Sequence, residues 1–279
     1  MLAIYLPREA QTIVRWALED LLHFKAAHFD KNNSLYKNSL TESEQEIWNA
    51  AVARLLAKEP LQYITERADF YGLKFRVNNQ VLIPRPETEE LVGWVLEEHH
   101  RKQQKKVLDI GTGSGCIPLS LQHNRPNWEI TGLDISEKAL NVAQNNAKHL
   151  NLTQTIFKKI DFLDHSAWPN LEKYDLIISN PPYIAATELA AMHENVTKFE
   201  PHLALFVPDN DVLLFYKTIA AFCATHLAEN GALYVEIHEK LGVETVNLFR
   251  KSGIFNQIIL QKDMSGRDRM IKCSRFLDN

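Results

Sequence analysis

The stretch Asn180-Pro181-Pro182-Tyr183 places two hydrogen-bond acceptors and an aromatic ring side by side. It follows Tyr174–Ser179, an apolar run that is typical of a buried strand. Because proline has a fixed φ and no backbone N–H, we expect the strand to end abruptly in a stiff loop. That loop presents the Asn180 side-chain amide, the Pro181 carbonyl and the Tyr183 ring. Asn-Pro is also common in ordinary turns, so a turn without chemistry is the alternative.

A second candidate is the glycine-rich stretch Asp109-Ile110-Gly111-Thr112-Gly113-Ser114-Gly115, which follows a short predicted strand. Three alternating glycines, in a chain that has only 10, allow unusual backbone angles and the close approach of a ligand. A dinucleotide-binding turn has the spacing G-x-G-x-x-G. The residues at the last position of that pattern are Cys116 and Pro118, so the spacing does not fit. A tight turn without a ligand is the alternative.

Acidic residues follow the next two predicted strands. Asp134 comes directly after the strand 129–133, where a carboxylate can accept hydrogen bonds from both hydroxyls of a ribose. It could equally cap the helix that begins after Ser136. Asp161-Phe162 ends the third strand region and could bind a ligand, or it could be a surface acid beside a core aromatic.

The elements that must position these residues alternate between strand and helix patterns from residue 106 onward. The predicted helices are 117–121, 137–150, 212–227 and 240–250, and the predicted strands are 107–110, 129–133, 154–158, 174–179, 232–237 and 256–260. This alternation predicts an α/β fold, a doubly wound sheet with right-handed crossovers. Ligands bind such sheets beyond the carboxyl ends of the strands, where the candidate residues lie.

The first part of the chain has a different pattern. Residues 1–66 show helical spacing of apolar residues, and Thr41-Glu42-Ser43-Glu44 has the sequence of a capping box. Residues 67–84 are rich in strand formers, with a turn signal at Asn78-Asn79, and predict a β-hairpin. We therefore expect a helical domain over 1–66, a hairpin linker over 67–84 and an α/β domain over 85–279.

Composition narrows the function classes. The 279 residues include 31 Lys and Arg against 35 Asp and Glu, a net charge of −4, which disfavours a general nucleic-acid grip. The main basic cluster, Arg101, Lys102, Lys105 and Lys106, has the pattern of a solvated helix end. Three separated cysteines without a C-x-x-C pair predict a reduced protein without a zinc site.

The sequence also indicates where the protein acts. The N-terminus reaches Arg8 before any long apolar run, which makes it a poor signal peptide. No uncharged run approaches the roughly 18 residues of a membrane span. We expect a soluble cytoplasmic protein with no membrane partner.

The glycine-rich stretch, with an acidic residue two places before it, resembles the first motif of class I S-adenosylmethionine methyltransferases. This resemblance implies a Rossmann-like fold in which the residues Gly111, Thr112, Gly113, Ser114 and Gly115 bind S-adenosyl-L-methionine. It also implies that Asp134 binds the ribose, that Asp161 and Phe162 lie by the adenine, and that Asn180 contacts the cofactor as well. The stretch from Asn180 to Tyr183 resembles the (N/D)-P-P-(Y/F) motif of methyltransferases that act on planar nitrogens, namely adenine, guanine or a glutamine amide.

The chemistry of planar nitrogens explains the residue types of that motif. An amide or aromatic amine nitrogen is a poor nucleophile because its lone pair is delocalised. The Asn180 side-chain oxygen and the Pro181 carbonyl can accept its two hydrogens and align it with the sulfonium methyl. Pro182 stiffens the loop, and Tyr183 can pack on the planar group. No strong general base is required, because the proton can leave once the nitrogen is cationic.

A closer resemblance spans nearly the whole chain and is weakest over residues 1–58. The stretches 59–64, 70–75, 81–89, 199–201 and 266–269 look like the HemK/PrmC family. Two departures are Thr65-Glu66-Arg67, where the family has a glycine in the turn, and Phe162, where some relatives have tryptophan.

The family resemblance implies methylation of the glutamine in the Gly-Gly-Gln motif of class 1 peptide-chain release factors. It further implies that the helical domain and the hairpin recognise the release factor. We also expect a monomer. Arg85, Glu87 and Thr88 lie at the domain junction, where they either line the cleft or form a rigid proline-bounded linker.

Three alternatives remain open from the sequence. An adenine-N6 or guanine-N2 nucleic-acid methyltransferase would carry the same Asn-Pro-Pro-Tyr motif, but the net charge of −4 and the lack of a basic recognition domain weigh against it. A non-catalytic cofactor-binding module would not need the intact Asn180-to-Tyr183 loop. A nicotinamide oxidoreductase is disfavoured by the glycine spacing.

Overall fold

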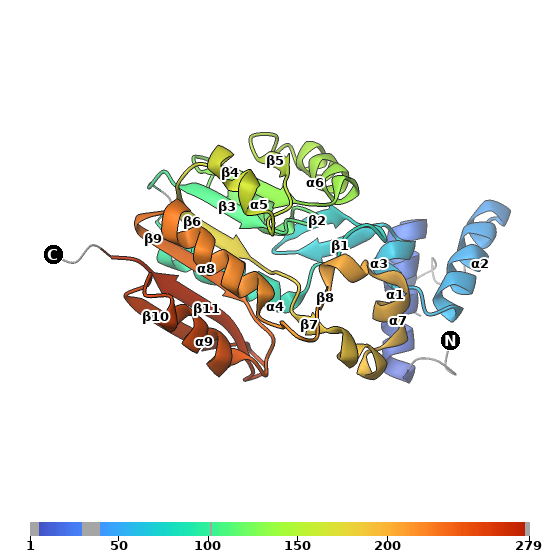
Figure 1. Ribbon diagram of the computed structural model, residues 1–279. Coiled ribbons are helices and arrows are strands. Elements are labelled where there is room, and N and C mark those ends of the chain that lie inside the picture. Colours follow the sequence, from blue (N-terminus) through green and yellow to red (C-terminus); the bar gives the residue numbers. More distant parts are fainter. Residues whose placement is uncertain (1–5, 30–39, 101, 277–279) are drawn as a thin grey trace. The chain divides into compact units, whose positions relative to one another are not determined.

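The computed structural model describes residues 6–29, 40–100 and 102–276 of the chain (Figure 1). These residues form two compact units, one of Met1–Arg67 with His193–Phe199 and one of Ala68–Met192 with Glu200–Asn279. Arg101 of the basic cluster and residues 1–5 of the assessed N-terminus lie outside the described residues. Within the described residues, no helix is both long enough and apolar enough to cross a membrane.

The first unit is helical. It contains α1 (Pro7–Leu22), η1 (Ala26–Phe29), α2 (Glu42–Leu56), α3 (Leu61–Ile64) and α7 (Glu194–Phe199). The predicted capping box is confirmed, since the Glu44 carboxylate accepts from the Thr41 N–H at 2.8 Å and the Thr41 hydroxyl accepts from the Glu44 N–H at 3.4 Å. Ala51, Leu55 and Ile64 form a small core. The return of α7 to this unit was not predicted; the Lys58 ammonium pairs with the Glu194 carboxylate at 3.1 Å.

The second unit confirms the predicted α/β class. Its seven-stranded sheet has the order β10-β11-β9-β6-β3-β4-β5. The strands are β3 (Lys106–Ile110), β4 (Glu129–Asp134), β5 (Ile156–Lys159), β6 (Tyr174–Ser179), β9 (Leu227–Glu236), β10 (Gln257–Lys262) and β11 (Asp268–Ser274). The sequence analysis missed β11, which pairs antiparallel with both β10 and β9. Strands β10 and β11 form an antiparallel hairpin, whereas the alternation of strands and helices predicted parallel strands.

Helices cover both faces of this sheet, with α4 behind it and α8 in front of it in Figure 1. The helices are α4 (Pro86–Glu98), α5 (Cys116–Asn124), α6 (Glu137–His149), α8 (Leu214–His226) and α9 (Gly242–Lys251). Short elements are η3 (His165–Asn170), β7 (Ile184–Ala185), η4 (Ala186–Ala191), η5 (His202–Ala204) and β8 (Phe206–Val207). The buried core lies between the sheet and α8, and it includes Ile177, Tyr216, Phe222 and Leu233.

The β-hairpin is shorter than the sequence suggested, and its expected turn was wrong. Strands β1 (Arg67–Phe70) and β2 (Leu73–Arg76) are joined at Tyr71-Gly72, not at Asn78-Asn79. Tyr71 and Gly72 have φ values of 47° and 77°, the conformation of a tight two-residue hairpin turn. The turn at Asn78 lies after the hairpin, where the Val81 N–H donates to the Asn78 carbonyl at 3.2 Å.

A buried amide in α6 joins the end of β2 to the glycine-rich loop. The Asn146 side chain is fully buried, and its Nδ2 donates to the Arg76 carbonyl at 3.0 Å and to the Ser114 carbonyl at 2.9 Å. Its Oδ1 accepts from the Arg76 N–H at 2.7 Å. One side chain therefore satisfies three backbone groups of two segments far apart in sequence.

Candidate active site

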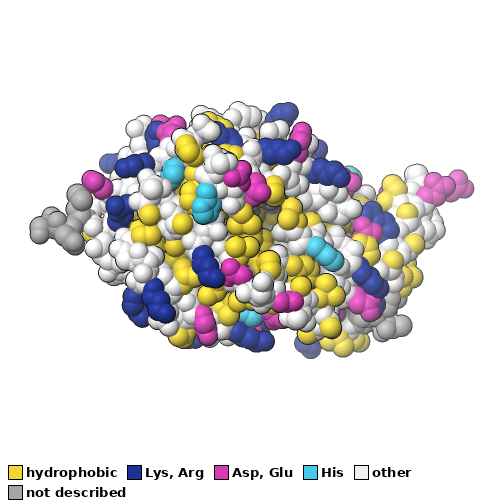
Figure 2. All heavy atoms as spheres, viewed as in Figure 1, with side chains coloured by type: hydrophobic (Ala, Val, Ile, Leu, Met, Phe, Trp, Pro, Cys, Tyr) yellow, Lys and Arg dark blue, Asp and Glu magenta, His cyan; other side chains and the backbone are white. Residues whose placement is uncertain are grey.

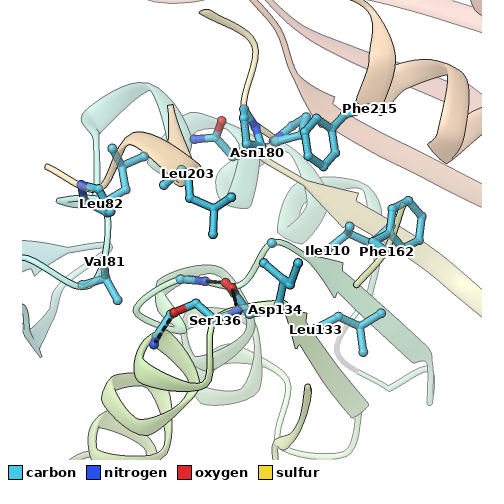
Figure 3. Close-up of a pocket in the computed structure, with 18 of the residues that line it drawn as sticks. Val81, Leu82, Ile110, Leu133, Asp134, Ser136, Phe162, Asn180, Leu203 and Phe215 are labelled. Carbon is cyan, nitrogen blue, oxygen red and sulfur yellow. Dashed lines mark hydrogen bonds between the residues drawn. The ribbon is translucent and has the colours of Figure 1, made fainter. Parts of the chain in front are cut away.

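A cavity of about 350 Å³ lies at the carboxyl ends of β3, β4 and β6, within the second unit (Figure 3). The neighbours of β3 are β4 on one side and β6 on the other, so the strand order reverses beside it. Such a reversal is where open α/β sheets bind ligands. Eight predicted site residues line the cavity: Gly111, Gly113, Asp134, Asp161, Phe162, Asn180, Pro181 and Pro182.

The glycine-rich loop presents its backbone to the cavity. Gly111 and Gly113 have φ values of 75° and 53°, and a Cβ at either position would meet no atom within 4 Å. Glycine is thus required there by backbone conformation, and the space beside it is open. The other three residues of the loop do not line the cavity, although they were also predicted to bind S-adenosylmethionine: Thr112, Ser114 and Gly115.

Asp134 ends β4 and holds the loop from its side chain. Its Oδ2 accepts from the Gly113 N–H at 2.9 Å and its Oδ1 accepts from the Ser136 N–H at 2.9 Å. The alternative role of helix cap belongs to Ser136, whose hydroxyl accepts from the Ala139 N–H at 3.2 Å. Burial raises the pKa of the Asp134 carboxyl, although both backbone donors favour its charged form. Each oxygen keeps further acceptor capacity at the cavity.

Asp109 is a functional candidate that the sequence analysis quoted in the motif but gave no role. Its side chain is fully buried on β3, and neither carboxylate oxygen has a hydrogen bond of good geometry among the described residues, although the Thr112 hydroxyl lies close enough to favour its charged form. The hydroxyls of Thr112 and Ser114 are likewise buried without a hydrogen bond of good geometry among the described residues. Burial raises the pKa of the Asp109 carboxyl to about 7.

Asp161 and Phe162 lie at the far wall of the cavity, after β5. The Asp161 Oδ1 accepts from the Leu163 N–H at 3.0 Å. Phe162 is 5% exposed and also packs in the core against Trp168 and Phe222, with ring centroids 5.6 and 5.2 Å away. Phe162 therefore lines the cavity and also packs in the core, and its contact with a ligand stays a prediction.

The loop after β6 presents Asn180, Pro181 and Pro182 to the cavity, but not Tyr183. The Asn180 Nδ2 donates to the Thr88 hydroxyl at 2.9 Å, which leaves Oδ1 as the unengaged end of the amide. The Tyr183 hydroxyl donates to the Glu236 Oε1 at 3.0 Å, away from the cavity. Burial raises the pKa of the Tyr183 phenol.

Arg85 and Thr88 lie within the second unit and outside the cavity lining, and Thr88 holds Asn180. Thr88, in the first turn of α4, donates to the Glu236 Oε2 at 2.6 Å. The Arg85 guanidinium pairs with the Glu200 carboxylate, which also accepts from the Ile83 N–H at 3.2 Å. Glu200 lies in the stretch 199–201 that resembles the family, but no role was predicted for it. Glu236 was not predicted, although an acid at the end of an apolar strand was the available signal. Within the described residues, no group of three or more His, Cys, Asp or Glu could hold a metal ion.

Several solved structures share this fold. A methyltransferase from Pyrococcus furiosus superposes with a TM-score of 0.51 at 16% identity, covering 85% of this chain and 100% of that one. A human methyltransferase 10 domain containing protein superposes with a TM-score of 0.53 at 17% identity, covering 83% of this chain and 98% of that one. At such identities the likeness extends to the fold alone.

Sequence comparisons are more specific. Residues 7–65 match the PrmC N-terminal domain, and residues 91–204 match the methyltransferase small domain. A release factor glutamine methyltransferase of Flavobacterium psychrophilum is 46% identical over 228 residues, which are 81% of this chain and 79% of that protein. One of Bacteroides thetaiotaomicron is 37% identical over 98% of this chain and 95% of its own length. This chain belongs to the release factor glutamine methyltransferase family.

Proposed function

We propose that this protein transfers the methyl group of S-adenosylmethionine to the side-chain amide nitrogen of the glutamine in the Gly-Gly-Gln motif of class 1 peptide-chain release factors. Family membership supports the reaction type. The observation that carries the acceptor chemistry is that Asn180 lines the cavity while its side-chain nitrogen is held by Thr88, which leaves the amide oxygen to accept from a substrate.

The residues around the glycine-rich loop fit the cofactor. S-adenosylmethionine, when bound, supplies an electrophilic methyl group on a sulfonium. The backbone at Gly111 and Gly113 would admit its methionyl end, and Asp109, when ionised, would provide a buried negative charge behind the loop. Asp134 accepts from the ribose hydroxyls, and Asp161 with Phe162 holds the adenine.

The loop after β6 holds the nitrogen that is methylated. The Asn180 Oδ1 and the Pro181 carbonyl accept the two amide hydrogens of the glutamine, which fixes the nitrogen in line for transfer. The same acceptors stabilise positive charge as it develops on the nitrogen. The proton leaves afterwards, because the methylated nitrogen is then acidic.

The partner is a protein rather than a nucleic acid. Basic and acidic side chains are interspersed on the face that Figure 2 shows, in keeping with the net charge of −4. We assign recognition of the release factor to the helical domain 1–66 and the hairpin linker 67–84, and transfer to the domain 85–279. We propose that the enzyme acts as a monomer in the cytoplasm.

The test is methyl transfer from labelled cofactor to purified release factor, with DNA and RNA as competing substrates. Label is expected on the Gly-Gly-Gln glutamine, and replacing that glutamine by alanine should abolish incorporation. Replacement by asparagine should abolish it too, because the amide retracts by one C–C bond, about 1.5 Å, from a fixed pair of acceptors. Heavier label on nucleic acid would instead support the base-methylating alternative, and undiminished label on the glutamine-free factor would reject that glutamine as the target.

A further inference from the structure

A chain of buried hydrogen bonds runs from the cavity into the protein behind it. The Asn180 Nδ2 donates to the Thr88 hydroxyl at 2.9 Å, and that hydroxyl donates to the Glu236 Oε2 at 2.6 Å. Thr88 is 3% exposed and Glu236 is 2% exposed, and neither lines the cavity. The chain therefore reaches the proposed acceptor site only through Asn180.

The number of protons in this chain decides which way the Asn180 amide faces. The two Glu236 oxygens each accept from a hydroxyl, one from Thr88 and one from Tyr183, which is the arrangement a carboxylate requires. Burial raises the pKa of Glu236, whereas these two hydrogen bonds and the charge of Arg269 favour its ionised form. A threonine hydroxyl has a single proton, and Thr88 gives it to Glu236. Only lone pairs of Thr88 then face Asn180, so Asn180 must present its NH₂ group to Thr88 and its oxygen to the cavity.

The two ends of an asparagine amide have nearly the same size, so shape alone does not select between them. With the amide reversed, N–H donors would face a substrate amide that itself brings two N–H donors to this loop. Repulsion between donors would then replace the acceptor that the transfer needs. The rotation of the Asn180 amide about its Cβ–Cγ bond therefore decides whether the loop offers the substrate an acceptor or a donor.

Glu236 also braces the loop from its other end. Tyr183, three residues after Asn180, donates its hydroxyl to the Glu236 Oε1 at 3.0 Å. One carboxylate on β9 therefore restrains both ends of the Asn180-to-Tyr183 loop, directly at Tyr183 and through Thr88 at Asn180. The two prolines between them have fixed φ values, so the Pro181 carbonyl is held as well.

We infer that Thr88 and Glu236 are positioning residues for methyl transfer, which hold the Asn180 amide with its oxygen toward the substrate nitrogen. The inference rests on the proposed function and adds to it a role for two residues that do not touch substrate or cofactor. Thr88→Val removes the hydroxyl and keeps the shape of the side chain. We expect it to lower kcat about tenfold to a hundredfold, the range for a misplaced reacting group, with cofactor affinity unchanged.

Conservative and control variants separate orientation from packing. Thr88→Ser restores the hydroxyl and should recover most of the rate. Thr245→Val makes the same change at an equally buried threonine of α9, whose hydroxyl donates to the Leu241 carbonyl of its own helix, and should leave kcat unchanged. Glu236→Gln leaves one acceptor for two hydroxyl donors and should lower kcat about tenfold or more.

A double-mutant cycle provides the decisive measurement. If Thr88 acts through Asn180, Thr88→Val should cost almost nothing further in an Asn180→Ala background. A purely structural role would instead give the same factor in both backgrounds. Cofactor affinity and the midpoint of unfolding are measured on each variant, so that loss of the fold is separated from loss of the rate.

The outcomes also separate this inference from the proposed function. Glutamine methylation by the wild type with a full rate for Thr88→Val would reject the positioning role and leave the function standing. Equal losses for Thr88→Val and Thr88→Ser, or a full effect of Thr88→Val without Asn180, would reject it as well. If the wild type transfers no methyl group to glutamine while it binds the cofactor, both proposals are wrong.

Discussion

The two sides of the cavity are built in different ways. On the cofactor side, short stretches directly after β3, β4 and β5 provide the loop backbone, Asp134, Asp161 and Phe162. On the acceptor side, Asn180 depends on Thr88 from α4 and on Glu236 from β9, which lie 92 and 56 positions away in the chain. A ligand that many proteins share can be held by local motifs, whereas one amide can be oriented only by partners brought together by the whole fold.

The largest effect is expected on the acceptor side. Asn180→Ala should lower kcat by about 10²–10³, because one positioned acceptor for developing charge is lost. Cofactor affinity should change little, since the residue lies at a loop end. Steady-state kinetics together with calorimetry of cofactor binding check both parts. A variant with unchanged kcat and lost cofactor affinity would remove the distinction between the two sides.

The second largest effect is expected at Asp109, whose buried carboxyl should make the stability of the protein depend on pH. The folded-state pKa of Asp109 is about 7, above its ordinary value of 3.8, so the folded protein holds a proton that the unfolded chain has released. Stability is therefore lost as pH rises through that window, and Asp109→Asn should be the more stable protein above it by a few kcal/mol.

Unfolding midpoints of the cofactor-free wild type and Asp109→Asn at pH 4, 6 and 8 measure this difference. The same variant should bind cofactor more weakly, because a negative charge near the cationic group is lost. Asp164→Asn is the control with the opposite sign, since hydrogen bonds from Ser166 lower the pKa of that exposed carboxyl. Equal pH profiles for wild type and Asp109→Asn would contradict the burial argument.

Asp134→Ala should weaken cofactor binding by about 1–3 kcal/mol, the cost of losing a charged hydrogen-bond acceptor. Because the change lies on the cofactor side, kcat at saturating cofactor should recover most of the wild-type value. Calorimetry with S-adenosylmethionine measures the affinity, and Asp209→Ala, an exposed aspartate outside the cavity lining, serves as the control. Tight binding of NAD by the wild type would overturn the assignment of the cofactor.

The smallest change is Gly113→Ala. The added Cβ meets no atom within 4 Å, so the cost to stability is only that of a positive φ at a residue other than glycine, about 1–2 kcal/mol. Chemical denaturation measures it, and calorimetry shows whether the methyl group intrudes on the cofactor. A much larger loss of stability would mean that the loop is packed rather than open.

The same contrast explains what the sequence could predict. The glycine-rich loop, Asp134 and the end of β6 were found because their information lies within a few residues of a strand. Glu236 was not found, since only the folded sheet brings β9 beside α4. β11 was missed because its antiparallel entry breaks the crossover pattern, and the hairpin turn was misplaced because Tyr71-Gly72 lacks the usual Asn-Gly composition. Tyr183 was predicted to pack on the planar group of the substrate, but its hydroxyl donates a hydrogen bond to Glu236.

Asn146 connects the glycine-rich loop of the cofactor side to the hairpin, a segment outside the local motifs. Its three hydrogen bonds join the backbone of Arg76, at the end of the hairpin, to the Ser114 carbonyl of the glycine-rich loop. A shift of the glycine-rich loop would leave the buried Ser114 carbonyl unpaired, a cost of roughly 1–3 kcal/mol, whereas the Arg76 bonds are only part-buried. A displacement of the hairpin end at Arg76 would therefore act on the glycine-rich loop at Ser114 through the Asn146 side chain.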